Sequence, residues 1–243
     1  MFIKTIVKIA LLAGISFFFL TLTASSAWCG GLEDSKAGMM AEKNGDPNRA
    51  LKLYTLAINS GDLPQKELAL IIYLRGNLFL ARNEYNRVID DASKAIELDP
   101  TGEAVPYAYH IRAAALSGIG QFESAIKDHN KSIELKPEYV DAYYSRALSW
   151  VKKGNKERAL ADFTKAIELK PQYAAAYRDR GNVWMEKGDS DRALSDYNRA
   201  IELDSSDALA YYNRGNFYIK KGDYDLAIKD SEKAVALNPE DSE

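Results

Sequence analysis

The chain has few of the residues on which disulfide-rich, metal-binding and many catalytic proteins depend. Its 243 residues include one cysteine and two histidines. Cys29 alone cannot form a disulfide within the chain, so the fold must be stabilised without such a crosslink. His110 and His129 are predicted to lie on different helices of one repeat, and we interpret both as packing or groove residues rather than metal ligands. We therefore expect neither a metal nor another cofactor.

An excess of positive charge is also absent. The 32 lysines and arginines are balanced by 35 aspartates and glutamates, which gives a formal net charge of −3 at pH 7. This balance lacks the basic footprint of a nucleic-acid-binding protein. No glycine-rich phosphate-binding loop is present, and Cys29 has no obvious histidine partner that would activate it as a nucleophile. The sequence therefore predicts a protein that is not an enzyme.

The first 27 residues differ in composition from the rest of the chain. Lys4 and Lys8 precede an apolar run over residues 9–22, and small residues follow up to Ala27. Charged, apolar and small-residue regions in this order are typical of a signal peptide. We expect residues 1–27 to be removed during export, with the periplasm as the destination.

Two alternatives stay open for this segment. The uncharged residues 9–26 are about long enough to remain as a membrane anchor. A lipid-modified Cys29 is the second alternative, although Trp28 stands where a lipoprotein signal peptidase prefers a small residue. Contact with a membrane is expected only through an N-terminal segment that is not cleaved.

A seven-residue phrase returns along the remainder of the chain. Its first copy reads Lys-Ala-Ile-Glu-Leu-Asp-Pro, and the copies begin at Lys94, Lys131, Lys165, Arg199 and Lys233. The last four copies are 34 residues apart. A fixed period of this size indicates a repeat array, in which each repeat buries its apolar face by stacking on its neighbours.

Each repeat is predicted to be a pair of antiparallel helices. In the repeat that begins at Ala208, apolar and small residues recur at helical spacing on both sides of a break at Gly222 and Asp223. The glycine suits a left-handed residue at the end of the first helix, and Pro239 cannot continue the second helix. In an earlier repeat, Asn83 takes the place of the turn glycine.

With these features the chain resembles the tetratricopeptide repeat (TPR) family, in its exported bacterial form. Small residues occupy the positions at which paired helices touch, namely Gly76, Ala113, Ala147, Gly181 and Gly215 on the first helices and Val88, Ala125, Ala159, Ala193 and Ala227 on the second. The resemblance implies an all-α, right-handed α-solenoid of stacked helix-turn-helix repeats, about six in number. We assign residues 31–62 to a degenerate repeat, 69–239 to an array of five clear repeats and 240–243 to a tail.

An arginine and an aspartate 16 residues later return in each of the five clear repeats. The predicted pairs are Arg75 and Asp91, Arg112 and Asp128, Arg146 and Asp162, Arg180 and Asp196, and Arg214 and Asp230. The first repeat has Ala37 and Leu53 at these places, so both members are missing together. We therefore predict an ion pair within each repeat that joins its two helices. A fold written five times needs identical charges, whereas a binding site does not, so we interpret these pairs as structural.

The resemblance also implies a partner-binding surface, because first helices of TPR proteins line a concave groove. The residues of this chain at such positions are Tyr73, Asn77, Tyr107, His110, Tyr144, Leu148, Arg178, Asn182, Tyr212, Asn213 and Asn216. Tyrosine rings give contact area at low entropic cost, and asparagine amides can bond an extended backbone in both directions. Arg178, Asn182 and Asn213 resemble part of the two-carboxylate clamp with which some family members hold the C-terminus of a chaperone. Tyr73, Tyr144 and Tyr212 could equally pack between repeats.

We therefore expect a scaffold that binds a peptide segment or a partner protein in its groove, in the bacterial cell envelope. The cell-envelope setting depends on analogy with exported family members alone. One alternative is an assembly subunit that stacks on a second copy through its C-terminal end, where Ile228, Val235 and Leu237 would be uncovered. Another is an accessory subunit of an enzyme on a different chain.

Overall fold

The computed structural model describes residues 30–238, and all of its regular structure is helical. Twelve helices and no strand occur within this range. The all-α fold predicted from the repeat is therefore confirmed. The predicted signal peptide at residues 1–27 and the tail at residues 240–243 lie outside the described residues. Within the described range, no helix is both long and apolar enough to cross a membrane.

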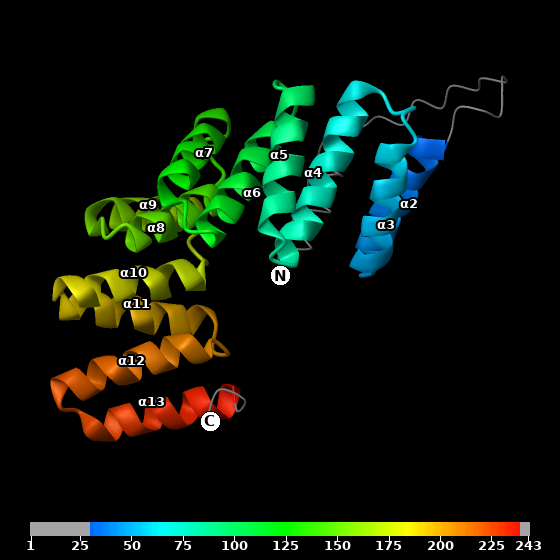
Figure 1. Ribbon diagram of the computed structural model, residues 1–243. Helices are drawn as coiled ribbons and strands as arrows, with labels where there is room; N and C mark the ends of the chain where they lie inside the picture. The colour runs from blue at the N-terminus through cyan, green and yellow to red at the C-terminus, as the bar shows by residue number, and fades with distance from the viewer. Residues whose placement is uncertain (1–29, 239–243) are drawn as a thin grey trace. The chain divides into compact units, whose positions relative to one another are not determined.

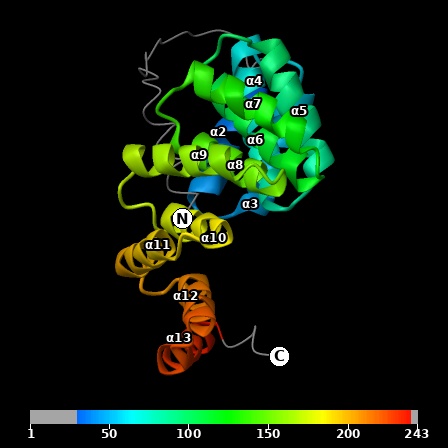
Figure 2. The ribbon, with the colours of Figure 1, turned by 90° about the vertical axis from the view of Figure 1, so that its left-hand side faces the viewer.

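The helices divide into two compact units, with the division between Ser124 and Ala125. The N-terminal unit contains α2 (Gly30–Lys43), α3 (Pro47–Asn59), α4 (Gln65–Ala81), α5 (Tyr85–Leu98) and α6 (Val105–Gly118) (Figure 1). The division falls in the first turn of α7 (Phe122–Leu135). The C-terminal unit continues with α8 (Val140–Lys152), α9 (Lys156–Leu169), α10 (Ala174–Lys187), α11 (Ser190–Leu203), α12 (Ala208–Lys221) and α13 (Tyr224–Leu237). Figure 2 shows α10 with α11, and α12 with α13, packed side by side as pairs.

A left-handed residue lies in the turn between the two helices of each pair. It is a glycine in five turns, at positions 45, 120, 154, 188 and 222, with φ between 74° and 83°. Asn83 occupies the sixth turn with a φ of 58°, as the sequence predicted. Glycine adopts this conformation without the steric cost that a Cβ imposes, and asparagine is among the residues that tolerate it best.

Close approach of the paired helices explains the small residues of the repeat. A Cβ added to Gly181 on α10 would lie 2.8 Å from the ring of Tyr197 on α11. Tyr197 itself is 2% exposed and packs in a core cluster with Phe217 of α12. The small residue on one helix therefore makes room for the large ring on the other, as close packing in a protein interior requires.

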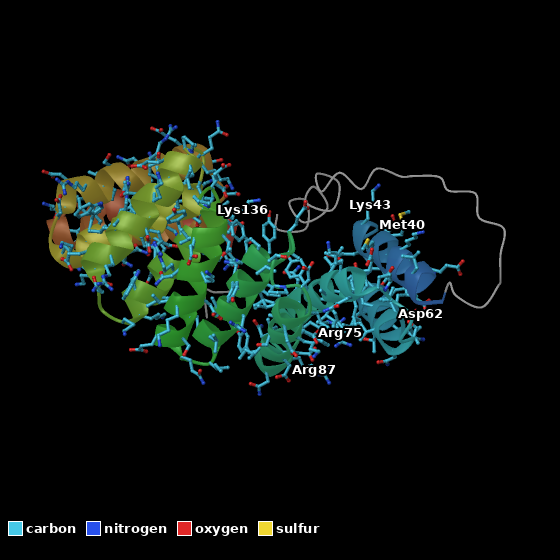
Figure 3. The ribbon with its side chains drawn as sticks, turned by 90° about the horizontal axis from the view of Figure 1, so that it is seen from above. Met40, Lys43, Asp62, Arg75, Arg87 and Lys136 are labelled. Atoms are coloured by element: carbon cyan, nitrogen blue, oxygen red, sulfur yellow. The ribbon has the colours of Figure 1, made fainter. Side chains whose placement is uncertain are left out.

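Bidentate ion pairs join the two helices of four repeats. In the N-terminal unit, Arg75 (Figure 3) donates from Nε and Nη2 to the carboxylate of Asp91, at 2.8 and 2.7 Å. Three pairs in the C-terminal unit have the same geometry: Arg146 with Asp162, Arg180 with Asp196 and Arg214 with Asp230. The four aspartates are buried, and Arg–carboxylate forks of this kind fix the orientation of both side chains. The fifth predicted pair, Arg112 with Asp128, stays a prediction.

The arginines also contact the preceding repeat, and the spacing of arginine and aspartate in the sequence does not predict these contacts. Nη1 of Arg146 donates to Asn130 on α7 at 2.7 Å, and Nη1 of Arg180 donates to Thr164 on α9 at 3.1 Å. Arg214 reaches Asn198 on α11 in the same way, and Arg112 reaches Ser93 on α5. Each of these arginines therefore ties a first helix to the second helix of the preceding repeat.

Candidate functional site on the first helices

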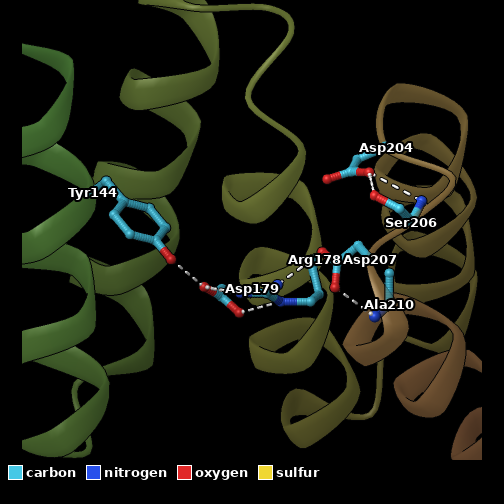
Figure 4. Close-up of polar contacts among 7 residues, drawn as sticks. All are labelled: Tyr144, Arg178, Asp179, Asp204, Ser206, Asp207 and Ala210. Carbon is cyan, nitrogen blue, oxygen red and sulfur yellow. Dashed lines mark hydrogen bonds and ion pairs between the residues drawn. The ribbon is translucent and has the colours of Figure 1, made fainter. Parts of the chain in front are cut away.

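The predicted binding residues of the C-terminal unit lie on α8, α10 and α12, where a chain of polar contacts connects the three helices (Figure 4). The hydroxyl of Tyr144 on α8 donates to Oδ2 of Asp179 on α10 at 2.7 Å. Arg178 donates to the same carboxylate from Nε at 3.0 Å and from Nη2 at 3.3 Å. Its Nη1 donates to Asp207 at 2.8 Å, and Asp207 caps α12 by accepting from the amide of Ala210.

The charge of Arg178 is compensated within this network by the carboxylates of Asp179 and Asp207. Burial alone would lower the pKa of Arg178, but its hydrogen bond to Asp179 and the charges of Asp179 and Asp207 raise that pKa above its ordinary value. Burial, followed by the charge of Asp179, raises the pKa of Tyr144. Arg178 therefore stays protonated and Tyr144 stays neutral at physiological pH. The network therefore connects α8, α10 and α12 through a charged guanidinium and a neutral hydroxyl group.

The geometry does not support the clamp role suggested for Arg178. Its side chain is 16% exposed and already faces two carboxylates of its own chain. Asn182, the second member of the trio, accepts a hydrogen bond from the hydroxyl of Tyr197 at 2.9 Å. Asn213, the third member, is half-buried on α12. A carboxylate ligand would have to displace Asp179 or Asp207 to reach the guanidinium.

Three predicted binding residues of the N-terminal unit are buried instead of accessible. Tyr73, Tyr107 and His110 are between 5% and 7% exposed, and the rings of Tyr73 and Tyr107 lie 6.4 Å apart. Burial lowers the pKa of His110 to about 4, so the imidazole is neutral at physiological pH. We therefore assign these three side chains to packing between helices. Asn77 is half-buried on α4.

The accessible part of the predicted surface is concentrated on α12. Tyr212 is 56% exposed, and Asn216 is also exposed one helical turn later. Leu209, which was not among the predicted binding residues, is 56% exposed. It lies on the same face, since residues 209, 212 and 216 recur at helical spacing. On α8, Leu148 is exposed at the equivalent of Asn216. These side chains offer rings, apolar groups and amides without a net charge.

The C-terminal helix pair also exposes apolar side chains on α13. Ile228 is 57% exposed and Val235 is 50% exposed, as predicted from the sequence. Leu237, which was also predicted to be exposed, is half-buried. Large exposed apolar groups that gather on one element often mark an interaction surface.

Comparison with known proteins relates this geometry to other helical repeats. Models of the tetratricopeptide repeat match residues 106–139, 140–173 and 208–241, and a model of the TPR repeat matches residues 181–222. Small glutamine-rich tetratricopeptide repeat-containing protein 2 of Mycosarcoma maydis is 38% identical over 68 residues, which are 28% of this chain and 18% of that protein. A Protein STIP1 homolog of Dictyostelium discoideum is 35% identical over 69 residues, 28% of this chain and 12% of that protein. The chain therefore spans less than a fifth of the length of these two relatives.

Solved structures resemble nearly the whole described fold. YrrB, a TPR protein with an unusual peptide-binding site, is 27% identical, with 77% of this chain and 93% of that chain covered and a TM-score of 0.57. A tetratricopeptide repeat protein from Parabacteroides merdae covers 97% of this chain, with 85% of its own chain, at a TM-score of 0.66. Its 18% identity shows a shared fold alone. The family models together match more than half of the chain, and the protein belongs to the tetratricopeptide repeat family, with an all-α helical repeat solenoid and the general role of a protein-interaction scaffold.

Proposed function

We propose that the face formed by Leu148, Asn182, Tyr212 and Asn216 on the first helices of the C-terminal unit binds a peptide segment of a partner protein. The exposure of Tyr212 beside Asn216 is the observation that carries this proposal. Tyrosine and asparagine are side chains that adaptable protein-binding surfaces use for area and for hydrogen bonds. The similarity to YrrB, a protein with a peptide-binding site, supports the same kind of ligand.

The charges around this face favour an internal segment of the partner over its C-terminal carboxylate. Arg178 is neutralised by Asp179 and Asp207, so it leaves little attraction for an incoming anion. Asn182 uses its carbonyl oxygen to accept from Tyr197, which leaves its NH₂ group to donate to a peptide carbonyl. Asn216 has both a donor and an acceptor group. We therefore propose recognition of backbone amides together with apolar side chains.

Alanine substitutions of Tyr212 and Asn216 test this proposal. Partners would first be identified by crosslinking and mass spectrometry, and the dissociation constant of an identified partner segment would then be measured. We expect the double variant to bind at least about tenfold more weakly, with an unchanged melting temperature. Leu56→Ala is the matched control, because Leu56 is a 47% exposed apolar residue on α3 of the other unit. Equal binding by the double variant and the wild type would reject this face.

We further propose that the protein is exported, on the basis of Lys4, Lys8, the apolar residues 9–22 and the small residues up to Ala27. N-terminal sequencing of the cellular protein tests this directly. Export with cleavage predicts a mature chain that starts at Trp28 and fractionates with the periplasm. An intact N-terminus in the membrane fraction would support the anchor, and an intact N-terminus in the cytosol would reject export.

A further inference from the structure

The outer side of α13 carries four residues whose counterparts elsewhere in the C-terminal unit are covered by a helix. We call Ile228, Ser231, Glu232 and Val235 the end face. Equivalent residues of successive repeats are 34 positions apart. Two repeats earlier, on α9, the residues equivalent to the end face are Leu160, Phe163, Thr164 and Ile167. Leu160, Phe163 and Ile167 are at most 9% exposed, and Val183 of α10 belongs to the same core cluster. Ile228 and Val235 are at least 50% exposed. The equivalent surface on α9 is therefore covered by the next helix, α10.

The covering helix brings an arginine to one particular position. Arg180 of α10 donates to Thr164, and Arg214 of α12 donates to Asn198, the equivalent residue on α11. Arg146 of α8 does the same with Asn130. Glu232 stands at this position on α13. The carboxylate of Glu232 therefore occupies the position at which Asn130, Thr164 and Asn198 each accept a hydrogen bond from an arginine. A hydrogen bond from an arginine to a carboxylate is stronger than one to a neutral acceptor.

We propose that the end face binds an amphipathic, arginine-bearing helix of a partner protein, which would lie across α13 as α10 lies across α9. Apolar side chains of the helix would cover Ile228 and Val235. Its arginine would donate to Glu232. This surface is separate from the face proposed above to bind a peptide segment, and it recognises a helix by its apolar stripe and one positive charge.

A second copy of this chain, stacked head to tail, fits the end face less well. The first helix of the described array, α2, contains no arginine, and Ala37 occupies the position that Arg180 has on α10. Stacking α2 on α13 would therefore cover Glu232 without the guanidinium that every contact of this kind supplies elsewhere in the C-terminal unit. Covering a carboxylate without a partner is unfavourable. The charge of Glu232 therefore selects a foreign helix that carries an arginine.

The test uses a fluorescein-labelled peptide that copies residues 174–187 and is held helical by a hydrocarbon bridge on its solvent side. This peptide contains Val183 and Arg180, two of the residues of α10 that contact α9. Its affinity for the full chain is measured by fluorescence anisotropy. We expect saturable binding that weakens about tenfold with the Arg180→Ala peptide and about tenfold with the Glu232→Ala chain. Combining the two changes should weaken binding no further, because both remove one interaction.

Two chain variants separate the end face from other surfaces. Ile228→Asp should abolish binding, whereas Leu56→Asp, at a similarly exposed site in the other unit, should leave it unchanged. Circular dichroism checks that both variants keep the wild-type helix content. Absence of saturable binding, or equal affinity of the wild-type and Glu232→Ala chains, would overturn the proposal. A wild-type dimer in sedimentation velocity that Ile228→Asp dissociates would also overturn it, because a second copy would then be the occupant.

Discussion

Helices α9 and α13 have closely related sequences and opposite environments. Both are the second helix of a pair in the C-terminal unit, and equivalent residues of the two helices are 68 positions apart in the sequence. Leu160 and Ile167 on α9 are 8% and 9% exposed, whereas the equivalent Ile228 and Val235 on α13 are 57% and 50% exposed. Phe163, which is fully buried, is replaced by Ser231 on α13.

The difference between the two helices shows that the repeat phrase does not decide by itself which residues form the core. A second helix that is followed by another described pair buries one side within its own pair and the other side against the next first helix. On α13 the inner residues Ala227 and Asp230 are buried, just as Ala159 and Asp162 are on α9. Only the outer side differs. Matched substitutions at equivalent positions can therefore measure what the covering helix contributes.

The largest difference is expected for apolar truncation on the outer side. Phe163→Ala should reduce the free energy of unfolding by about 3–5 kcal/mol, because it removes a fully buried ring and leaves a cavity. Ile228→Ala on α13 should change it by less than about 0.5 kcal/mol, since the side chain is already more than half exposed. Urea unfolding followed by circular dichroism measures both. Similar losses for the two variants would show that α13 is covered in solution.

A smaller difference is expected for alanine at the helix-contact glycines. Gly181→Ala should cost about 1–3 kcal/mol, because the new methyl group would lie 2.8 Å from the ring of Tyr197. At Gly215 the nearest atom is Oγ of Ser231 at 3.4 Å, so alanine fits and its helix propensity should add up to about 1 kcal/mol. The two variants are compared by thermal unfolding. A destabilised Gly215→Ala variant would mean that the last helix pair is packed as tightly as the inner ones.

The smallest difference is expected for removal of one hydroxyl group from the first helices. Tyr144→Phe loses the hydrogen bond to Asp179 and should reduce the free energy of unfolding by about 1 kcal/mol. Tyr212 is equivalent to Tyr144 two repeats later, and its side chain is 56% exposed. Tyr212→Phe should therefore leave stability unchanged. Equal effects of the two substitutions, measured by urea unfolding, would contradict the idea that only Tyr144 takes part in a contact between repeats.

Much of the fold could be predicted because each repeat needs the same ion pair and the same left-handed turn residue, so these residues recur at fixed positions in the sequence. An arginine and an aspartate 16 residues later recur in each clear repeat, and Arg146 and Asp162 are one such pair. The alignment of the repeats alone therefore predicts the ion pair between the two helices. Asn83 could be identified as a turn residue in the same way, since every equivalent position is a glycine with positive φ. Recurrence turns a weak local signal into a specific prediction.

The binding residues were harder to predict because they occur once and depend on neighbours distant in sequence. Arg178 resembled a ligand-binding cation until the structure placed Asp207, 29 residues later, within 2.8 Å of it. Tyr73 and Tyr107 lie at variable positions of the repeat, yet the packing of adjacent pairs buries both rings. The alignment indicates which face of a helix a residue occupies, but not how closely the next helix approaches.

Amide hydrogen exchange of α9 and α13 tests the central contrast most directly. Helices that are covered on both sides open only with larger parts of a structure, whereas a helix at an exposed edge opens by itself. We expect the amides of α13 to exchange at least about tenfold faster than those of α9 in the same sample. Equal protection of the two helices would contradict this account, because it would show that the outer side of α13 is covered when the chain is alone.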